Sequence, residues 1–439
     1  MDEKKKEFQS IPTSKVQRAM KVIGASAKVG GNYAAHYAKS MVGVKETKAE
    51  LDRKNAETVI GTLGEMKGTA LKMAQMLSMD EFTLPEQYQK AFEQAQHNAP
   101  PLSFPLVQKT IRSQFGKEIN ELFDSFSKNA IHAASIGQVH RAEKDGVKLA
   151  VKVQYPGVAE SIESDIRLMK PIAQKMLNVP QNEMEFYIEE VQKTLVEETD
   201  YLNELKMGEL LYEKCKPVPN LRIPKYYSDL TKSRVLTMEF VEGDLLTEWL
   251  SNKPSEAQRQ LVAQTIWDAF LFQIQELRMV HADPHPGNFI ITDKNEVCLI
   301  DFGCVKELDE EFYKDFFELL DLDVLNNDEL LKEKMYRLNY LNENDKPEEI
   351  AYLFESLKHS MLLIAEPFQH ESFSFANWDY MKGLYSQGEE LAKEMRKRRI
   401  NSARGPKQGI YLLRTFYGLY MILAKLGAEV KLNYTLNQK

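Results

Sequence analysis

Two runs of alternating apolar residues, 136–143 and 147–153, flank the dipeptide Asp145-Gly146. Asp-Gly readily adopts the positive φ angles of a two-residue hairpin turn, so this pattern predicts two antiparallel strands joined by a tight turn. The hairpin excludes an all-helical chain, although most of the remaining sequence is helical in pattern. Further strands are predicted at 234–241, 288–292 and 297–300.

Apolar residues at three- and four-residue steps mark the helices. These are predicted at 59–77, 105–126, 258–277, 309–325 and 409–426, and the last is either a partner-facing amphipathic helix or ordinary core. Together the two patterns predict an α+β chain in four parts. The parts are a flexible leader of short helices at 1–50, a helical extension at 51–128, a small strand-rich lobe at 129–242 and a larger, mostly helical lobe at 243–439.

Charge and hydropathy limit the partners and the location. The 57 basic and 65 acidic residues give a net charge of −8, which argues against a general nucleic-acid binder because phosphate backbones attract excess cation. The N-terminus is charged and lacks the apolar core of a secretory signal. The most apolar stretch, 415–424, has about half the length of a bilayer span. We expect a cytoplasmic protein, and a peripheral membrane contact stays open.

The most specific chemistry lies between His281 and Gly303. Asp283 and Asn288 are five residues apart, and Asp301-Phe302-Gly303 follows 13 residues after Asn288, at the end of a predicted strand. Phosphoryl transfer needs a carboxylate that orients the attacking hydroxyl or water, and oxygen ligands that hold Mg²⁺ against nucleotide phosphates. Asp283 suits the first role, and Asn288 and Asp301 suit the second. His281 is expected to brace this loop and the Asp-Phe-Gly backbone.

Other residues around this segment allow two interpretations. Lys152, on the second strand of the hairpin, either holds the α- and β-phosphates or faces solvent. The run 236–243 either holds adenine near Glu239 and Val241 or is a buried strand entering a turn. His285 is either a catalytic group or an ordinary loop residue. The order of lysine strand, hinge, Asp-x4-Asn loop and Asp-Phe-Gly favours the functional interpretation for Lys152 and the hinge.

With these parts in order, the chain resembles the UbiB/aarF-type atypical kinases of the protein-kinase-like superfamily. Three further segments carry the resemblance. Residues 71–78 are similar to the family's Lys-x-Gly-Gln motif, with Ala74 in place of the glycine; 133–140 are similar to its alanine-rich nucleotide loop; and Glu198-Thr199-Asp200 is similar to its Glu-x-Asp motif. The resemblance implies a bilobal protein-kinase-like fold, with a β-rich N-lobe and a helical C-lobe.

The resemblance also implies ATP or ADP as ligand, with Mg²⁺. It assigns catalytic or phosphate-holding roles to Asp283 and to Lys152 paired with Glu204. It places Lys72 against Glu198 and Asp200, with Gln75 on the same helix face, over the site where a peptide would bind. The residues implied in nucleotide binding are Ala133, Ala134, Ser135, Ile136, Gly137, Gln138, Lys152, Glu239, Val241, Lys72, Gln75, Glu198 and Asp200.

The nucleotide loop has one glycine, Gly137, where protein kinases carry several, so its phosphate contacts should differ from theirs. The leading hypothesis is a Mg²⁺-dependent ATPase or a small-molecule or lipid phosphotransferase. The resemblance implies work in isoprenoid quinone or membrane-lipid metabolism, with lipid or quinone-pathway protein partners. The alternatives are a protein kinase and a nucleotide-gated module that binds membranes or partners.

Overall fold

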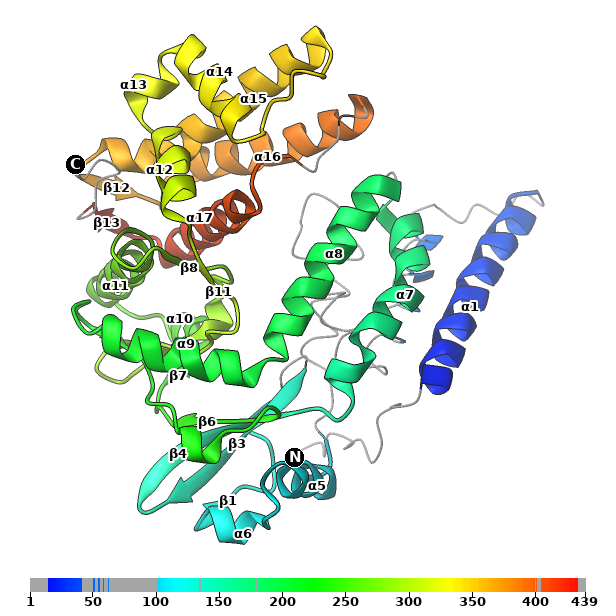
Figure 1. Ribbon diagram of the computed structural model, residues 1–439, viewed down its shortest axis with the longest axis vertical. Coiled ribbons are helices and arrows are strands. Elements are labelled where there is room, and N and C mark those ends of the chain that lie inside the picture. Colours follow the sequence, from blue (N-terminus) through cyan, green and yellow to red (C-terminus); the bar gives the residue numbers. More distant parts are fainter. Residues whose placement is uncertain are drawn as a thin grey trace. The chain divides into compact units, whose positions relative to one another are not determined.

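The computed structural model describes residues 15–41, 50–51, 54–55, 58, 62, 102–133, 136–177, 181–398, 400 and 404–432. The chain divides into two compact units (Figure 1). Unit 1 comprises residues 1–205 and 226–240, and unit 2 comprises 206–225 and 241–439.

Unit 1 is built on a five-stranded antiparallel sheet. Its order is β1-β3-β4-β6, with β2 paired to β3. The predicted hairpin is confirmed, because Asp145 and Gly146 have φ angles of 51° and 74° and join β3 to β4. The strands are β1 (Ser125–Phe126), β2 (His132–Ala133), β3 (Gly137–Lys144), β4 (Val147–Gln154) and β6 (Val235–Glu239).

Helix α5 covers this sheet with an apolar face. Val107 and Ile111 of α5 are fully buried in one cluster with Val151 and Val153 of β4. The cluster explains the alternation along β4, because Leu149, Val151 and Val153 occupy alternate positions and all three are buried in it. Outside the sheet, unit 1 contains α1 (Lys15–Met41), α5 (Phe104–Phe115), α6 (Ile119–Leu122), α7 (Val158–Leu177), α8 (Gln181–Glu198) and the 3-10 turn η1 (Ser228–Leu230).

The leader contradicts the sequence prediction. In place of short helices, α1 runs unbroken for 27 residues, past Gly24, Gly30 and Gly31. Each glycine costs a helix about 1 kcal/mol relative to alanine, so tertiary contacts must offset that cost. One such contact is the buried ion pair between Arg18 and Asp165 of α7, with Nε 2.6 Å from Oδ1. In Figure 1, α7 lies between α1 and α8.

Unit 2 is mostly helical, with short strands beside the long helices. Helix α9 (Tyr201–Lys214) begins in unit 1 and continues into unit 2. A four-stranded sheet has the order β5-β10-β9-β7, and two pairs, β8–β11 and β12–β13, complete the strands. The strands of unit 2 are β5 (Leu221–Arg222), β7 (Asp244–Leu245), β8 (Met279–His281), β9 (Phe289–Ile291), β10 (Val297–Leu299), β11 (Val305–Glu307), β12 (Ser372–Ser374) and β13 (Glu429–Lys431).

Helix α11 packs against α17 and against strands β5, β8, β10 and β13, and its Trp267 and Phe270 are almost completely buried. Helix α17 is also lined with buried residues, including Tyr411, Phe416 and Leu423, so the core interpretation of this segment is confirmed. The elements are α10 (Leu246–Ser251), α11 (Glu256–Gln275), η2 (Pro286–Asn288), α12 (Glu310–Glu318), α13 (Leu322–Leu325), α14 (Asp328–Arg337), α15 (Pro347–Ala365), η3 (Glu366–Gln369), α16 (Trp378–Arg398) and α17 (Lys407–Leu426).

Two predicted helices are each divided in the structure. The segment 105–126 breaks at Gly116, whose left-handed φ of 66° ends α5. The segment 309–325 breaks at Asp321, whose carboxylate caps α13 by accepting from Asp323 N. Apolar spacing continued across both breaks, which is why the sequence pattern missed them. Residues 206–225, assigned by sequence to the small lobe, group with unit 2, where β5 pairs with β10.

Candidate functional site

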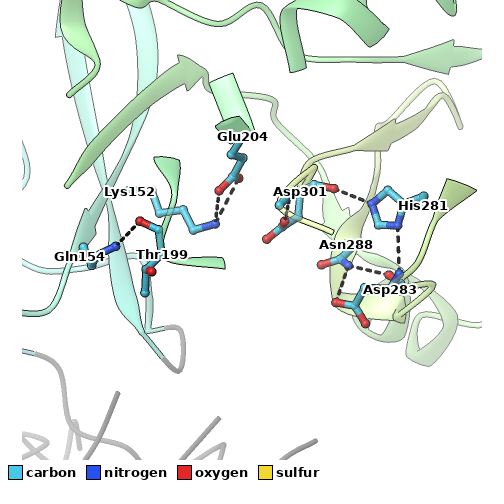
Figure 2. Close-up of polar contacts among 9 residues, drawn as sticks. Lys152, Gln154, Thr199, Glu204, His281, Asp283, Asn288 and Asp301 are labelled. Atoms are coloured by element: carbon cyan, nitrogen blue, oxygen red, sulfur yellow. Dashed lines mark hydrogen bonds and ion pairs between the residues drawn. The ribbon is translucent and has the colours of Figure 1, made fainter. Parts of the chain in front are cut away.

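In unit 1 the structure brings Lys152 and Glu204 together. Lys152 lies on β4 between β3 and β6, opposite Val139 and Leu236. Its Nζ lies 3.0 Å from Oε2 and 3.1 Å from Oε1 of Glu204 on α9 (Figure 2). The two side chains are only 12% and 2% exposed. The ion pair fixes the position of the ammonium, and its contact with phosphates stays a prediction.

The Glu-x-Asp segment anchors the helix that carries Glu204. Asp200 accepts a hydrogen bond from Asn203 N at 3.0 Å and so caps the start of α9. Gln154, at the end of β4, donates to Thr199 O at 3.0 Å. Glu198 is half-buried at the end of α8. Sequence reasoning missed Gln154, and its only signal was a polar residue at the end of an apolar strand.

Two side chains of the predicted nucleotide loop are buried inside unit 1, so any nucleotide contact at these positions would involve the backbone. Ile136 is 3% exposed and belongs to the apolar core of unit 1. Gln138 is 0% exposed; its Oε1 accepts from Leu102 N at 2.7 Å, and its Nε2 lies 2.9 Å from His140 Nε2. Both side chains are committed to internal packing and are not available to a ligand.

Among the remaining predicted nucleotide-loop and motif residues, Ala133 lies in a strand and four are not described by the structure. Ala133 ends β2, and His132 before it is exposed. Ala134, Ser135, Lys72 and Gln75 lie outside the described residues.

The predicted hinge lies where the two units divide. Glu239 ends β6, pairs with Leu149 and is half-buried. Val241, buried at 5% exposure, is the first residue of unit 2 after Phe240. The strand is therefore present as predicted, and its adenine contacts stay a prediction.

In unit 2, a hydrogen-bonded network holds Asp283, Asn288 and Asp301. Asn288 Nδ2 donates to Asp283 O at 2.9 Å and to Asp283 Oδ2 at 3.3 Å. The backbone ties the same residues together, because Ile300 N donates to Asn288 O at 3.1 Å. In Figure 2 the side-chain oxygen of Asn288 points away from Asp283, toward the side where Asp301 lies.

The expected bracing role of His281 is confirmed. Its buried ring places Nε2 2.5 Å from Asp301 O, and its Nδ1 accepts from Asp283 N at 3.4 Å. Because Asp301 O can only accept and Asp283 N can only donate, Nε2 is the donor and Nδ1 the acceptor in these contacts. His285 is exposed, and its Nδ1 accepts from Gly287 N at 3.0 Å, which caps the turn η2.

Helix α17 supports the same loop from behind. Thr415 Oγ1 donates to His281 O at 3.2 Å. A Cβ on Gly418 would lie 2.4 Å from Pro284 Cγ, so the helix backbone packs directly against the residue after Asp283. The sequence did not predict this contact, because the apolar spacing of α17 does not indicate which segment the helix packs against.

The segment between Gly303 and the next helix, α12, comprises only residues 304–309 and includes strand β11. Val305–Glu307 forms β11, paired with β8, and Ala282 N donates to Cys304 O at 3.1 Å. Helix α12 begins at Glu310. Residues 304–309 contain no serine, threonine or tyrosine. The segment that follows Asp-Phe-Gly is therefore held in strand pairing and offers no hydroxyl for phosphorylation.

The residue types of this network suit Mg²⁺. Asn288 carries an amide oxygen and Asp301 a carboxylate, whose Oδ1 accepts from Gly303 N at 3.0 Å. In the part of the chain that the structure describes, no three His, Cys, Asp or Glu side chains form a metal cluster. Mg²⁺ commonly takes one or two protein oxygens and completes its shell with phosphates and water.

Comparison with solved structures defines the class of fold. The Rv3197–erythromycin complex from Mycobacterium tuberculosis aligns with a TM-score of 0.56 and 25% identity, over 87% of this chain and 95% of that one. Residues 94–335, more than half of the sequence, match the ABC1 atypical kinase-like domain. The chain has the bilobal, kinase-like α+β fold.

The chain belongs to the ABC1 atypical kinase-like family, the UbiB group that the sequence motifs resembled. It is 29% identical over 395 residues to a probable serine/threonine-protein kinase, abkA, of Dictyostelium discoideum, covering 86% of this chain and 69% of that protein. It is 28% identical over 442 residues to the mitochondrial atypical kinase COQ8B of Danio rerio, covering 98% and 69%.

AarF domain-containing protein kinase 1 of Xenopus tropicalis is 34% identical over 279 residues, 62% of this chain and 53% of that protein. The chain thus spans between about half and about two thirds of the length of these curated relatives. Among its described helices, none is long and apolar enough to cross a membrane.

Proposed function

We propose that the chain binds Mg²⁺–ATP and either hydrolyses it or transfers its terminal phosphoryl group to a small molecule or lipid. By analogy with relatives named COQ8, the proposal places this activity in support of isoprenoid quinone or membrane-lipid metabolism. The observation that carries it is the Asp283–Asn288–Asp301 network, in which a carboxylate and two hard oxygen ligands are fixed by the backbone and by His281.

Each residue has a role in this proposal. Asp283, oriented by Asn288 Nδ2, accepts the proton of the attacking hydroxyl or water. Asn288 and Asp301 hold Mg²⁺, which neutralises charge on the phosphates when bound. Lys152, fixed by Glu204, holds phosphate oxygens. Glu239, Val241 and the backbone of 133–137 are proposed to contact the nucleotide, with ATP or ADP as ligand.

The test is Asp301→Asn, which keeps the shape and the acceptor for Gly303 N but removes the charge that holds Mg²⁺. We expect phosphate release from Mg²⁺–ATP to fall at least about 100-fold. Asp293→Asn is the matched control, because Asp293 is an exposed loop carboxylate of the same unit. Equal turnover by Asp301→Asn and wild type would reject the assignment.

Protein kinase activity is the second candidate, since several relatives carry that name. The segment 304–309 argues against protein kinase activity, because it is short and includes the strand-paired residues 305–307. Protein kinases carry a longer activation segment between Asp-Phe-Gly and the following helices. Transfer of labelled phosphate to a protein, lost in Asp283→Asn, would favour this candidate. Nucleotide binding without phosphate release or transfer would favour a nucleotide-gated binding module.

A further inference from the structure

Gly137, the only glycine of the nucleotide loop, is explained by internal packing. A Cβ at this position would lie 2.8 Å from Val153 O and 2.9 Å from the hydroxyl of Tyr201. Real Cβ atoms do not approach other atoms so closely, so Tyr201 and the β4 backbone together exclude every side chain here. The position of the Tyr201 hydroxyl is therefore one of the two reasons why residue 137 is a glycine.

Tyr201 also contacts the lysine of the site. It is completely buried at the start of α9, and its ring centroid lies 5.2 Å from Lys152 Nζ. Three residues later on the same helix, Glu204 makes the ion pair with that ammonium. Positions i and i+3 share a helix face, so one turn of α9 presents an aromatic ring and a carboxylate to the same cation.

The start of this helix turn is held in place. Asp200 caps it through Asn203 N, and Gln154 binds Thr199 O from the strand that carries Lys152. Tyr201 thus sits on a fixed backbone between the loop glycine and the lysine. A displacement of the Tyr201 ring would therefore change the surroundings of Gly137 and of Lys152 together.

We propose that Tyr201 is a positioning residue: its ring holds the ammonium of Lys152 beside Glu204, and its hydroxyl sets the approach of the Gly137 strand. Attraction between an ammonium and a ring face is strong where both are desolvated, as they are here. The consequence for nucleotide use rests on the proposed function, whereas the contact itself can be tested without nucleotide.

The first experiment measures how fast an amine-reactive reagent modifies Lys152, read by mass spectrometry of its peptide in nucleotide-free protein. Tyr201→Met fills much of the space but removes the ring, and we expect modification of Lys152 to accelerate about tenfold. Tyr201→Phe keeps the ring and should match wild type. Tyr226→Leu, which removes another buried tyrosine of unit 1, should leave the rate unchanged.

The second experiment measures phosphate release. We expect the KM for Mg²⁺–ATP to rise about tenfold in Tyr201→Met with a smaller change in kcat, because Lys152 holds phosphates in this scheme. An unchanged labelling rate in folded Tyr201→Met overturns the inference. An absence of turnover in wild type would reject the proposed function and leave the labelling result standing.

A third measurement keeps the inference testable where Tyr201→Met does not fold. Gly137→Ala is introduced into wild type and into Tyr201→Phe, and each pair is compared by urea unfolding. Because the phenolic oxygen is one of the two obstructing atoms, Gly137→Ala should destabilise the Tyr201→Phe protein less than wild type. Equal destabilisation in the two backgrounds overturns the packing part of the inference.

Discussion

The contact between Gly418 of α17 and Pro284 allows a test of whether this helix positions the loop that carries Asp283, the proposed catalytic base. This helix lies beyond residue 335, where the match to the family domain ends. In Gly418→Ala the new methyl carbon would lie 2.4 Å from Pro284 Cγ and 3.2 Å from Pro284 O. Ordinary carbon–carbon contacts begin near about 3.5 Å, so the helix or Pro284 must move by about 1 Å.

The displacement has two measurable effects. Overpacking of this kind costs about 1–3 kcal/mol, so the free energy of unfolding should fall by that amount in urea titrations. Pro284 follows Asp283 directly, and a shift of about 1 Å in a catalytic group lowers the rate by up to about 100-fold. We therefore expect kcat for phosphate release to fall by about ten- to 100-fold, while the KM for Mg²⁺–ATP changes little.

Gly383→Ala provides the matched control. Gly383 lies within α16 of the same unit, and a Cβ there would meet nothing within 4 Å. Alanine at an open helical position stabilises by about 0.5–1 kcal/mol, so this variant should be more stable and equally active. If Gly418→Ala behaved like Gly383→Ala in both assays, the claim that α17 seats the catalytic loop would fail.

Two further predictions concern charged and titratable groups. Burial lowers the pKa of His140, whose ring contacts Gln138 Nε2 and Ser127 O. Below about pH 6.5 the unfolded chain therefore takes up a proton at this residue more readily than the folded chain does. The free energy of unfolding should fall between about pH 7 and pH 5 for this reason. His140→Leu should lack that part of the fall, and an identical pH dependence would contradict the assignment. Arg404 hydrogen-bonds Asp345 at 2.5 and 2.8 Å and lowers the pKa of that carboxyl. The pair therefore stabilises the fold above the ordinary Asp pKa, and this stabilisation is lost as the pH falls through the lowered pKa. Arg404→Met should cost about 3 kcal/mol at pH 7 and less at pH 3, whereas Lys397→Met at an exposed pair should cost under about 1 kcal/mol.

Local chemistry made much of this fold predictable. Asp145-Gly146 specifies its own turn, and apolar spacing marks α11 and α17 within about two residues of their observed ends. The residues of the Asp-x4-Asn loop are close in the chain, so their mutual contacts follow from a short segment. Half of the role of His281 was predictable for the same reason, since its ring contacts the backbone two residues away, whereas its contact with Asp301 O spans 20 residues.

Other features depended on contacts between distant residues. Gln138 belongs to a loop that resembles a nucleotide-binding motif, yet a partner 36 residues earlier, Leu102, occupies its amide. Helix α1 continues past three glycines because Arg18 pairs with Asp165, 147 residues away. Spacing along the chain gives no measure of either distance.

The sequence by itself determined the class of the protein, the hairpin and several long helices, and the polar residues of the Asp-x4-Asn and Asp-Phe-Gly segments. Periodicity shows which face of a helix is buried and motif spacing shows which groups are neighbours in a loop, and both are local properties. Only the tertiary structure decided that Tyr201 lies against Lys152 and Gly137, and that Gly418 lies against Pro284. Those contacts arise from close packing between elements far apart in the chain, where the identity of the neighbour, not the pattern of the segment, sets what each residue does.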